Sequence, residues 1–331
     1  MIISRAPVRF SLGGGGTDIP AYYSKFGGYL VASAIDSYIY VSINKRFYHD
    51  IRLSYSKTET VSSVDLIEHR IFREALRSSG ISSGVELTSV ADVPANSGLG
   101  SSSTFTVALL NALHTYNRNY RSSRDLAEEA CDLEINRLRE PIGKQDQYIA
   151  AFGGVTAFTF APDGSVEVEP VPVRDDVLDD LGNSLCIVYS GVERAASVVL
   201  SEQGQRVRDL DEGTVNRMHR IKELGHEVFR LLSRGDIDQY GDLLHEHWTN
   251  KRKLASKMTD STIDEHYEAA RKAGAIGGKL MGAGGGGFFM FYVRPAEKRR
   301  LIEAMTARGL RRLRFRFDFD GARIVANLHR S

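Results

Sequence analysis

The spacing of hydrophobic and polar positions predicts strands mixed with helices in the first part of the chain. Residues 1–12 alternate in the manner of a strand, and residues 29–36 and 37–46 are predicted to form an antiparallel pair. A helix is expected near residues 64–77, and a further strand at 85–90. The opening third is therefore neither all-helical nor a simple series of strands.

Two consecutive helices are predicted next. In the first, apolar side chains recur along one helical face at Phe105, Ala108, Leu109, Ala112, Leu113 and Tyr116. The second begins near Ser123 and ends before Pro141, and its apolar positions are Leu126, Ala130, Leu133 and Leu138.

The second half is predicted to be mainly helical, and it follows three further strands at 154–160, 166–173 and 184–190. Helices are expected from about residue 205 to 273, and then come a glycine-rich segment at 277–293, a helix near 296–308 and a closing strand at 312–320. Elements in this order indicate an α+β protein of two domains. We place the domains at residues 1–190 and 191–331.

Composition and charge narrow the class of protein. The 331 residues are 42% hydrophobic and 26% charged, with a formal net charge of +1. Such a balance gives no broad field to hold nucleic acid or a membrane surface, so any anion site must be local. Two cysteines, Cys131 and Cys186, lie in apolar segments and suggest core residues in a reducing compartment. We expect a cytoplasmic protein, monomeric or homodimeric, with no membrane span.

The stretch NSGLGSSSTF at residues 96–105 sets two glycines and three serines at the start of a predicted helix. The first N–H groups of a helix lack partners and its dipole is positive there, so this position attracts an anion. Gly98 and Gly100 would let the backbone approach that anion closely. The simpler alternative is a serine N-cap that only starts the helix.

Other glycine-rich motifs are excluded by their context. Gly282, Gly284 and Gly287 fit GxGxxG, but a strand follows them where a dinucleotide fingerprint needs a helix. No Walker A loop occurs, and the HRD and DFG signatures of protein kinases are absent. The pair His245 and His247 does not have the HExxH spacing, and we expect both on a helix surface.

Three glycine-rich turns in order resemble the motifs of the GHMP small-molecule kinases. They are APVRFSLGGGGTD at 6–18, PANSGLGSSS at 94–103 and KLMGAGGGGFFMF at 279–291, so the resemblance spans nearly the whole chain. It implies an N-terminal α+β domain joined to a C-terminal ferredoxin-like α+β domain, with the active site between them. It also implies ATP and Mg²⁺ as cofactors.

The resemblance assigns roles to residues that suit phosphoryl transfer. The ATP phosphates would be bound by Ser97, Gly98, Leu99, Gly100, Ser101, Ser102 and Ser103. Ser102 and Glu134 would hold Mg²⁺, as hard oxygen ligands do, although an N-cap and a solvated helix charge are the alternatives. Asp146, in GKQDQYIAAFGG at 143–154, would be the base. Arg9 would pair with Asp146 and stabilise charge near the transferred group, unless it is only a charge at a strand end.

The resemblance also implies a sugar as the acceptor substrate, and this sugar would lie against the first and third motifs. The residues expected to bind it are Gly14, Gly15, Gly16, Thr17, Asp18, Gly284, Gly285 and Arg194. Galactose kinases carry Glu and His where this chain has Gly15 and Gly16, and the glycines leave more room. The form of the motifs is most similar to that of the members that phosphorylate the anomeric hydroxyl of D-glycero-D-manno-heptose 7-phosphate, a step toward nucleotide-activated heptose for surface polysaccharide.

Several questions stay open at the level of sequence. A phosphorylated sugar needs a basic clamp, for which Arg194 is the first candidate and Arg46 and Lys144 are others. The alternatives in function are a kinase for another sugar such as fucose or galactose, a kinase for an isoprenoid alcohol, which Asp18 disfavours, or a nucleotide-binding regulator without catalysis.

Overall fold

The computed structural model describes residues 1–192, 196–256 and 258–328. Its strands are β1 Ile2–Gly13, β2 Gly28–Lys45, β3 Ile51–Ser54, β4 Thr58–Val61, β5 Val85–Ala91, β6 Val155–Phe160, β7 Val166–Pro170, β8 Leu185–Tyr189, β9 Ala275–Leu280, β10 Phe288–Val293, β11 Arg311–Leu313 and β12 Arg323–Asn327. Its α-helices are α1 Pro20–Phe26, α2 Arg70–Ser79, α3 Ser101–Tyr116, α4 Ser123–Cys131, α5 Gln145–Phe152, α6 Asp175–Ser184, α7 Ala196–Arg208, α8 Glu212–Arg234, α9 Tyr240–Lys251, α10 Ser261–Lys272 and α11 Lys298–Ala307. A π-helix covers Asp132–Arg137, and 3₁₀ turns cover Val64–Leu66, Ile237–Gln239 and Pro295–Glu297.

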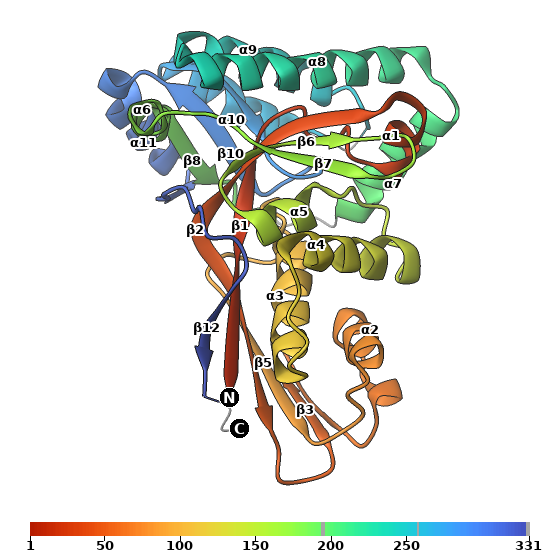
Figure 1. Cartoon of the computed structure of the whole chain (residues 1–331). Helices are drawn as coiled ribbons and strands as arrows, with labels where there is room; N and C mark the ends of the chain where they lie inside the picture. The colour runs from red at the N-terminus through yellow and green to blue at the C-terminus, as the bar shows by residue number, and fades with distance from the viewer. Residues whose placement is uncertain (193–195, 257, 329–331) are drawn as a thin grey trace.

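The larger sheet has the strand order β12-β1-β2-β5-β3-β4, and β6 and β7 extend it from the other end of β2. Figure 1 shows β1 and β2 as its long central strands, with α3 running beside them. The expected closing strand at 312–320 is shorter than predicted, because β11 ends at Leu313. The sequence reading missed β12, which lies antiparallel to β1.

The predicted hairpin of 29–36 and 37–46 is wrong, since both segments belong to the single strand β2. Its first part pairs with β6 and its later part with β5, so β2 changes partner partway along. The change falls near Asp36, whose N–H donates to the carbonyl of Arg316. The Asp36–Ser37 step carries none of the Asn-Gly chemistry that a tight hairpin turn requires.

The smaller sheet has the order β11-β8-β10-β9, and its pairs are antiparallel. Helices connect β8 to β9 and β10 to β11, which is the arrangement of a ferredoxin-like fold. The predicted two-domain α+β architecture is confirmed. The two sheets do not divide at the expected boundary after residue 190. Strand β8 precedes that residue yet joins the smaller sheet, and β12 follows it yet joins the larger sheet. The exact domain boundary stays a prediction.

Helix α9 approaches strand β9 unusually closely. A Cβ at Gly277 would collide with the backbone carbonyl of Gly241, and a Cβ at Gly241 would lie 2.7 Å from Ile276 Cγ2. Two glycines at this crossing therefore allow the helix to rest directly on the strand. One continuous core joins the two sheets, since buried residues of β1, β2, β8 and β10 belong to a single cluster.

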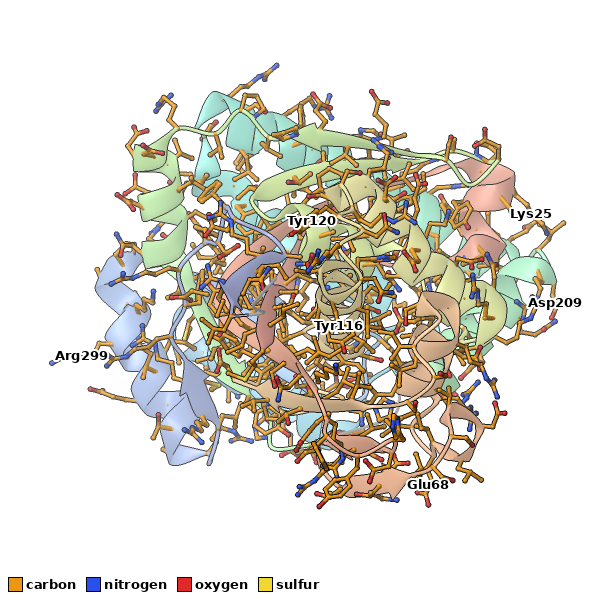
Figure 2. All side chains as sticks on the ribbon, turned by 60° about the horizontal axis from the view of Figure 1, so that its bottom comes forward. Lys25, Glu68, Tyr116, Tyr120, Asp209 and Arg299 are labelled. Carbon is orange, nitrogen blue, oxygen red and sulfur yellow. The ribbon has the colours of Figure 1, made fainter. Side chains whose placement is uncertain are left out.

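The buried side chains are mainly apolar, and charged side chains lie at the surface. Figure 2 shows Lys25, Asp209 and Arg299 projecting at the rim of the molecule. Cys131 and Cys186 are both buried free thiols, as the sequence predicted. None of the helices in the described ranges combines the length and apolar character needed to cross a membrane.

Candidate active site

A cavity of about 290 Å³ opens between the two parts of the molecule. Its walls come from β1 and the turn after it, the loop that leads into α3, the start of α5, helix α9, strand β9 and the glycine turn after β9. Apolar side chains also line it, namely Ile19, Ile71, Ile142, Leu200 and Met281. The glycine-rich turns of the sequence thus meet at one hollow.

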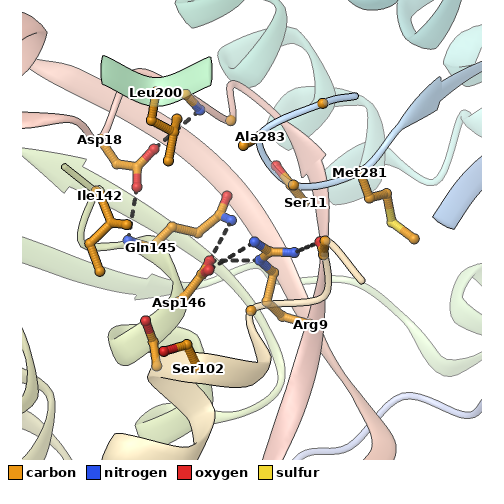
Figure 3. A pocket seen from close by; sticks show the side chains of 18 of the residues that line it. Arg9, Ser11, Asp18, Ser102, Ile142, Gln145, Asp146, Leu200, Met281 and Ala283 are labelled. Atoms are coloured by element: carbon orange, nitrogen blue, oxygen red, sulfur yellow. Dashed lines mark hydrogen bonds and ion pairs between the residues drawn. The ribbon is translucent and has the colours of Figure 1, made fainter. Parts of the chain in front are cut away.

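Arg9 and Asp146 form a two-point ion pair at the centre of the cavity wall (Figure 3). Arg9 Nε donates to Asp146 Oδ1 at 2.7 Å, and its NH2 group donates to Oδ2 at 2.9 Å. Gln145 Nε2 also donates to Oδ1, at 3.0 Å. The Arg9 side chain is 5% exposed and that of Asp146 is 25% exposed. The carboxylate is therefore held in a fixed orientation while remaining accessible from the cavity.

An irregularity in β1 places Arg9. The pairing of β1 with β2 shifts between Pro7 and Arg9, and the Arg9 N–H donates instead to the carbonyl of Leu99. The guanidinium NH1 donates to the carbonyl of Gly98 at 2.5 Å. A bulge of this kind redirects a side chain. Here it ties the first glycine motif to the second.

The loop before α3 has the geometry expected of a phosphate cradle. Helix α3 begins at Ser101, which confirms that the serines lie at a helix N-terminus. Gly100 has φ +77°, and a Cβ there would lie 2.9 Å from the carboxyl carbon of Asp146. Only glycine allows both that backbone and that approach. The predicted residues that line the cavity are Gly98, Gly100, Ser101, Ser102 and Ser103, whereas Ser97 and Leu99 are buried behind it.

The second and third glycine motifs are joined by their backbones. The Phe288 N–H donates to the carbonyl of Ser97 at 3.1 Å. A Cβ at Gly98 would lie 2.7 Å from the Met281 carbonyl oxygen, and one at Gly282 would lie 2.5 Å from the Gly98 Cα. The absence of side chains at such glycines therefore lets the two loops pack backbone against backbone.

Glu134 is a buried carboxylate without a cationic partner among the residues described. It accepts hydrogen bonds from Ser102 Oγ at 3.3 Å and from Gln147 Nε2 at 2.7 Å. Burial raises its pKa to about 7, the nearby Asp146 charge adds to the rise, and these hydrogen bonds oppose it. A π-helix, a form often found at functional sites, carries Glu134 inward from α4. Two adjoining oxygen groups and an uncompensated negative charge fit a hard divalent cation.

Asp18 ends the first motif and is held by backbone donors. Its Oδ1 accepts from the Gly16 N–H at 3.1 Å, and its Oδ2 accepts from the Gln145 N–H at 3.0 Å. Burial raises the pKa of Asp18. Gly15, Gly16 and Asp18 line the cavity. Thr17 does not, because its hydroxyl donates to the carbonyls of Gly14 and Tyr29 within the fold. Gly14 likewise lies outside the cavity lining, directly against Tyr29 and Leu30 of β2.

The other predicted sugar contacts are dispersed. Gly284 lines the cavity, while Gly285 does not and instead donates its N–H to the carbonyl of Met258. Arg194 lies outside the described residues. Arg46 is paired with Asp50 and Glu86, and Lys144 donates to the carbonyl of Gly164. Neither of these two basic residues lines the cavity.

Sequence reasoning missed a basic wall of the cavity made by His247, Lys251 and Lys279. The prediction that His247 lies on a helix surface is wrong, since it is 2% exposed and faces the cavity. His245 is exposed, and its Nδ1 is 2.7 Å from the hydroxyl of Tyr267. His247 and Lys251 are four residues apart on α9, a spacing that could have placed them on one helical face.

Ser11 and Gln145 are two further residues that the sequence did not suggest. Both residues line the cavity, and the Ser11 hydroxyl and the Gln145 side-chain oxygen are buried without a hydrogen-bond partner in the described part of the chain. Buried polar atoms usually have partners, so a bound ligand would complete them.

Comparison with known proteins agrees with this geometry. Residues 65–154 match the profile described as GHMP kinases N terminal domain, and residues 228–310 match GHMP kinases C terminal. The chain belongs to the GHMP kinase family. This GHMP kinase is therefore a phosphotransferase that uses an alcohol group as acceptor.

Relatives of this GHMP kinase include sugar kinases. It is 28% identical to the D-glycero-alpha-D-manno-heptose 7-phosphate kinase of Campylobacter jejuni, over 92% of this chain and 93% of that protein. The crystal structure of a D-glycero-D-manno-heptose 1-phosphate kinase from Bacteroides thetaiotaomicron superposes with a TM-score of 0.83, at 26% identity over 99% of this chain and 100% of that one. A bifunctional fucokinase/GDP-fucose pyrophosphorylase of Arabidopsis thaliana is 27% identical over 69% of this chain and 22% of its own length.

Proposed function

We propose that this GHMP kinase transfers the γ-phosphoryl group of ATP to the anomeric hydroxyl of D-glycero-D-manno-heptose 7-phosphate, giving the 1,7-bisphosphate. The observation that carries the proposal is the oriented Arg9–Asp146 pair, set in one cavity with the serine-rich helix start and Asp18. The Campylobacter relative supports the choice of sugar.

Asp146 would act as the base. The C1 hydroxyl oxygen bonds to the γ-phosphorus, the bond from that phosphorus to the β–γ bridging oxygen breaks, and ADP leaves with the electron pair. The hydroxyl proton passes to Asp146, a transfer that general bases promote. Asp146 Oδ1 already accepts two hydrogen bonds and Oδ2 accepts one, which favours Oδ2 as the atom facing the sugar.

Arg9 and the start of α3 would supply positive charge. The helix N-terminus, with Ser101, Ser102 and Ser103, is suited to hold the ATP phosphates. Arg9 holds Asp146 and also donates to the Gly98 carbonyl of the phosphate-binding loop. Its positive charge would stabilise the negative charge that develops on the transferred phosphoryl group. Ser102 and Glu134 would hold Mg²⁺, which neutralises charge on the β and γ oxygens when it is bound.

The sugar assignment is the finer part of the proposal. Gly15 and Gly16 leave room where a galactose kinase carries two polar side chains, and a seven-carbon substrate needs that room. The relatives' names differ over the phosphate, since one is a 7-phosphate kinase and the other a 1-phosphate kinase. A fucose or galactose kinase is the second candidate, favoured by the fucokinase relative and a galactokinase of Pyrococcus furiosus. We also predict that the protein is cytoplasmic.

Phosphorus NMR of the product tests the proposal. The enzyme is given ATP, Mg²⁺ and one sugar at a time, from a panel with heptose 7-phosphate, heptose 1-phosphate, fucose and galactose. A new resonance coupled to the anomeric proton of heptose 7-phosphate is expected. Phosphate at another carbon, or turnover of fucose or galactose alone, would contradict the heptose assignment and leave the kinase assignment intact. No transfer to any sugar, despite ATP binding, would favour a regulator.

A further inference from the structure

The basic wall of the cavity consists of three buried side chains that form no ion pair among the described residues. Lys279 is 1% exposed, His247 is 2% exposed and Lys251 is 8% exposed, and all three line the cavity. Lys279 Nζ and both ring nitrogens of His247 have no hydrogen-bond partner among the residues that the structure describes. Lys251 Nζ donates to the carbonyls of Leu280 at 3.1 Å and Gly282 at 2.5 Å. None of the three forms an ion pair within the described ranges.

The fold holds these side chains together rigidly. His247 and Lys251 lie one helical turn apart on α9, and Lys279 lies on β9, the strand on which α9 rests. The crossing is tight because Gly241 and Gly277 meet there without side chains. The polar groups are therefore positioned in advance, on secondary structure rather than on a flexible loop.

Their energetics point to a missing anion. Burial, and then the charge of Arg9, lowers the pKa of Lys251 to about 7. Burial also lowers the pKa of Lys279 well below its usual range, with Lys251 and Arg9 adding to the effect. Burying such unpaired groups is costly, so they are rarely retained without a partner. An anion in the cavity would supply the acceptor that Lys279 and His247 lack.

We propose that Lys279, Lys251 and His247 form the subsite for the phosphate monoester carried by the acceptor sugar. The inference rests on the proposed function and replaces the clamp that sequence analysis sought in Arg194, Arg46 and Lys144. A phosphate offers several strong acceptor oxygens, which suits ammonium and imidazole donors converging from two elements.

The position of the wall favours the acceptor over the nucleotide. In Figure 3, Ser102 lies on one side of the Arg9–Asp146 pair, and Ser11 and Met281 lie on the other. Lys251 donates to the carbonyls on either side of Met281, and its charge interacts with that of Asp18. The serine-rich helix start would hold the ATP phosphates. A phosphate on the wall is therefore the acceptor's own.

Lys279→Met and Lys251→Met test the subsite with two substrates, D-glycero-D-manno-heptose with and without its 7-phosphate. Each variant should raise KM for the phosphorylated sugar by about 10- to 100-fold, because a charged hydrogen bond is lost, and should lower kcat/KM more for the phosphorylated sugar than for the free sugar. Lys298→Met is the matched control. Lys298 is a partly buried lysine of α11 whose Nζ also donates to two carbonyls, those of Gly182 and Asn183, away from the cavity.

A binding measurement separates this inference from the proposed reaction. With ADP and Mg²⁺ present, inorganic phosphate should raise the melting temperature of the parent and the control, and not that of Lys279→Met. Such a result supports the subsite even if heptose 7-phosphate is not turned over. Equal phosphate stabilisation of parent and variant would overturn it. Weaker ATP binding with an unchanged KM for the sugar phosphate would assign the wall to the nucleotide and also overturn it.

Discussion

At the scale of single residues, a substitution of Asp146 tests the proposed mechanism most directly. Asp146→Asn keeps the shape of the side chain but removes its charge and basicity. We expect kcat to fall by about 10² to 10⁴, the usual contribution of a general base, with ATP affinity nearly unchanged. Steady-state kinetics and nucleotide titration measure the two effects. Asp132→Asn is the control, because Asp132 pairs with Arg137 in a comparable but exposed ion pair.

Other results for Asp146→Asn would be equally clear. If kcat stays within about a factor of two, Asp146 is not the base. If ATP binding and thermal stability are lost together, Asp146 is instead a structural partner, whose loss leaves the buried Arg9 charge unpaired.

Glu134→Gln should raise the Mg²⁺ concentration that gives half-maximal rate, since a neutral amide oxygen is a weaker ligand for a hard cation. The fold should persist, because the change is close to isosteric and the side chain already lies among hydrogen-bond partners. A magnesium titration of initial rate measures the effect. Glu128→Gln, an exposed position on α4, is the control. An unchanged magnesium requirement would remove Glu134 from the cation site.

Because of Lys251, we expect the stability of the ligand-free enzyme to depend on pH. Burial lowers the pKa of Lys251 from its ordinary value of 10.5 to about 7, so between these pH values the unfolded chain binds more protons. Stability should therefore gain from this group as pH rises through that window. The charged groups that face Lys251 are Arg9 of β1 and Asp18 after it, with Lys279 of β9 and His247 of α9 close by.

Anion binding should show the opposite trend, because the ammonium form is the one that binds. At pH 8, calorimetry in buffers of different ionisation enthalpy should register proton uptake when sulfate binds, since sulfate does not itself titrate there. Lys251→Met should reduce that uptake and the gain in stability with pH, and Lys279, whose pKa burial also lowers, contributes to what remains. Sulfate binding with no proton exchange would mean that Lys251 is already charged in the free protein.

At the scale of elements, the contact between the second and third glycine motifs decides the shape of the cavity. Gly282→Ala would place a methyl group 2.5 Å from the Gly98 Cα, in a backbone with φ +69°. We expect weaker ATP binding and a melting temperature lower by several degrees, since both loops must shift. Gly309→Ala is the matched control, because its φ is +83° and nothing lies within 4 Å of the added group. Equal effects of the two changes would show that backbone strain alone is responsible.

The sequence predicted features that are set by nearby residues and missed features that are set by the pairing of distant strands. The start of α3 follows from local periodicity and turns, whereas the ferredoxin-like sheet was implied by the resemblance of the three glycine motifs to those of the family; both are confirmed. The continuity of β2 was missed because it depends on a change of partner strands distant in sequence. Strand β12 alternates too weakly to be seen without β1 beside it.

The same distinction applies to the site. Glycines, serines and a carboxylate in fixed motifs could be named from the sequence, since each motif is a short contiguous segment. The basic wall could not, because it exists only once α9 and β9 cross at Gly241 and Gly277. Nothing in the sequence around His247 distinguishes a buried imidazole from a surface one.

At the scale of the whole molecule, the cavity depends on both sheets at once. Arg9 comes from the larger sheet and Lys279 from the smaller, and they line the same cavity. The backbone hydrogen bond between Phe288 and Ser97 links the two parts at the cavity itself. Neither half on its own would therefore present a complete site.

The pairing of β12 with β1 has a consequence for how the protein is made. Ile2 of β1 pairs with Asn327 of β12, which lies at the far end of the described residues. The larger sheet thus cannot be completed during translation until β12 has left the ribosome. Throughout that interval β1 keeps an open row of amide and carbonyl groups, the kind of edge that recruits strands from other molecules. Premature chain termination anywhere before residue 323 would therefore yield a product whose first liability is aggregation.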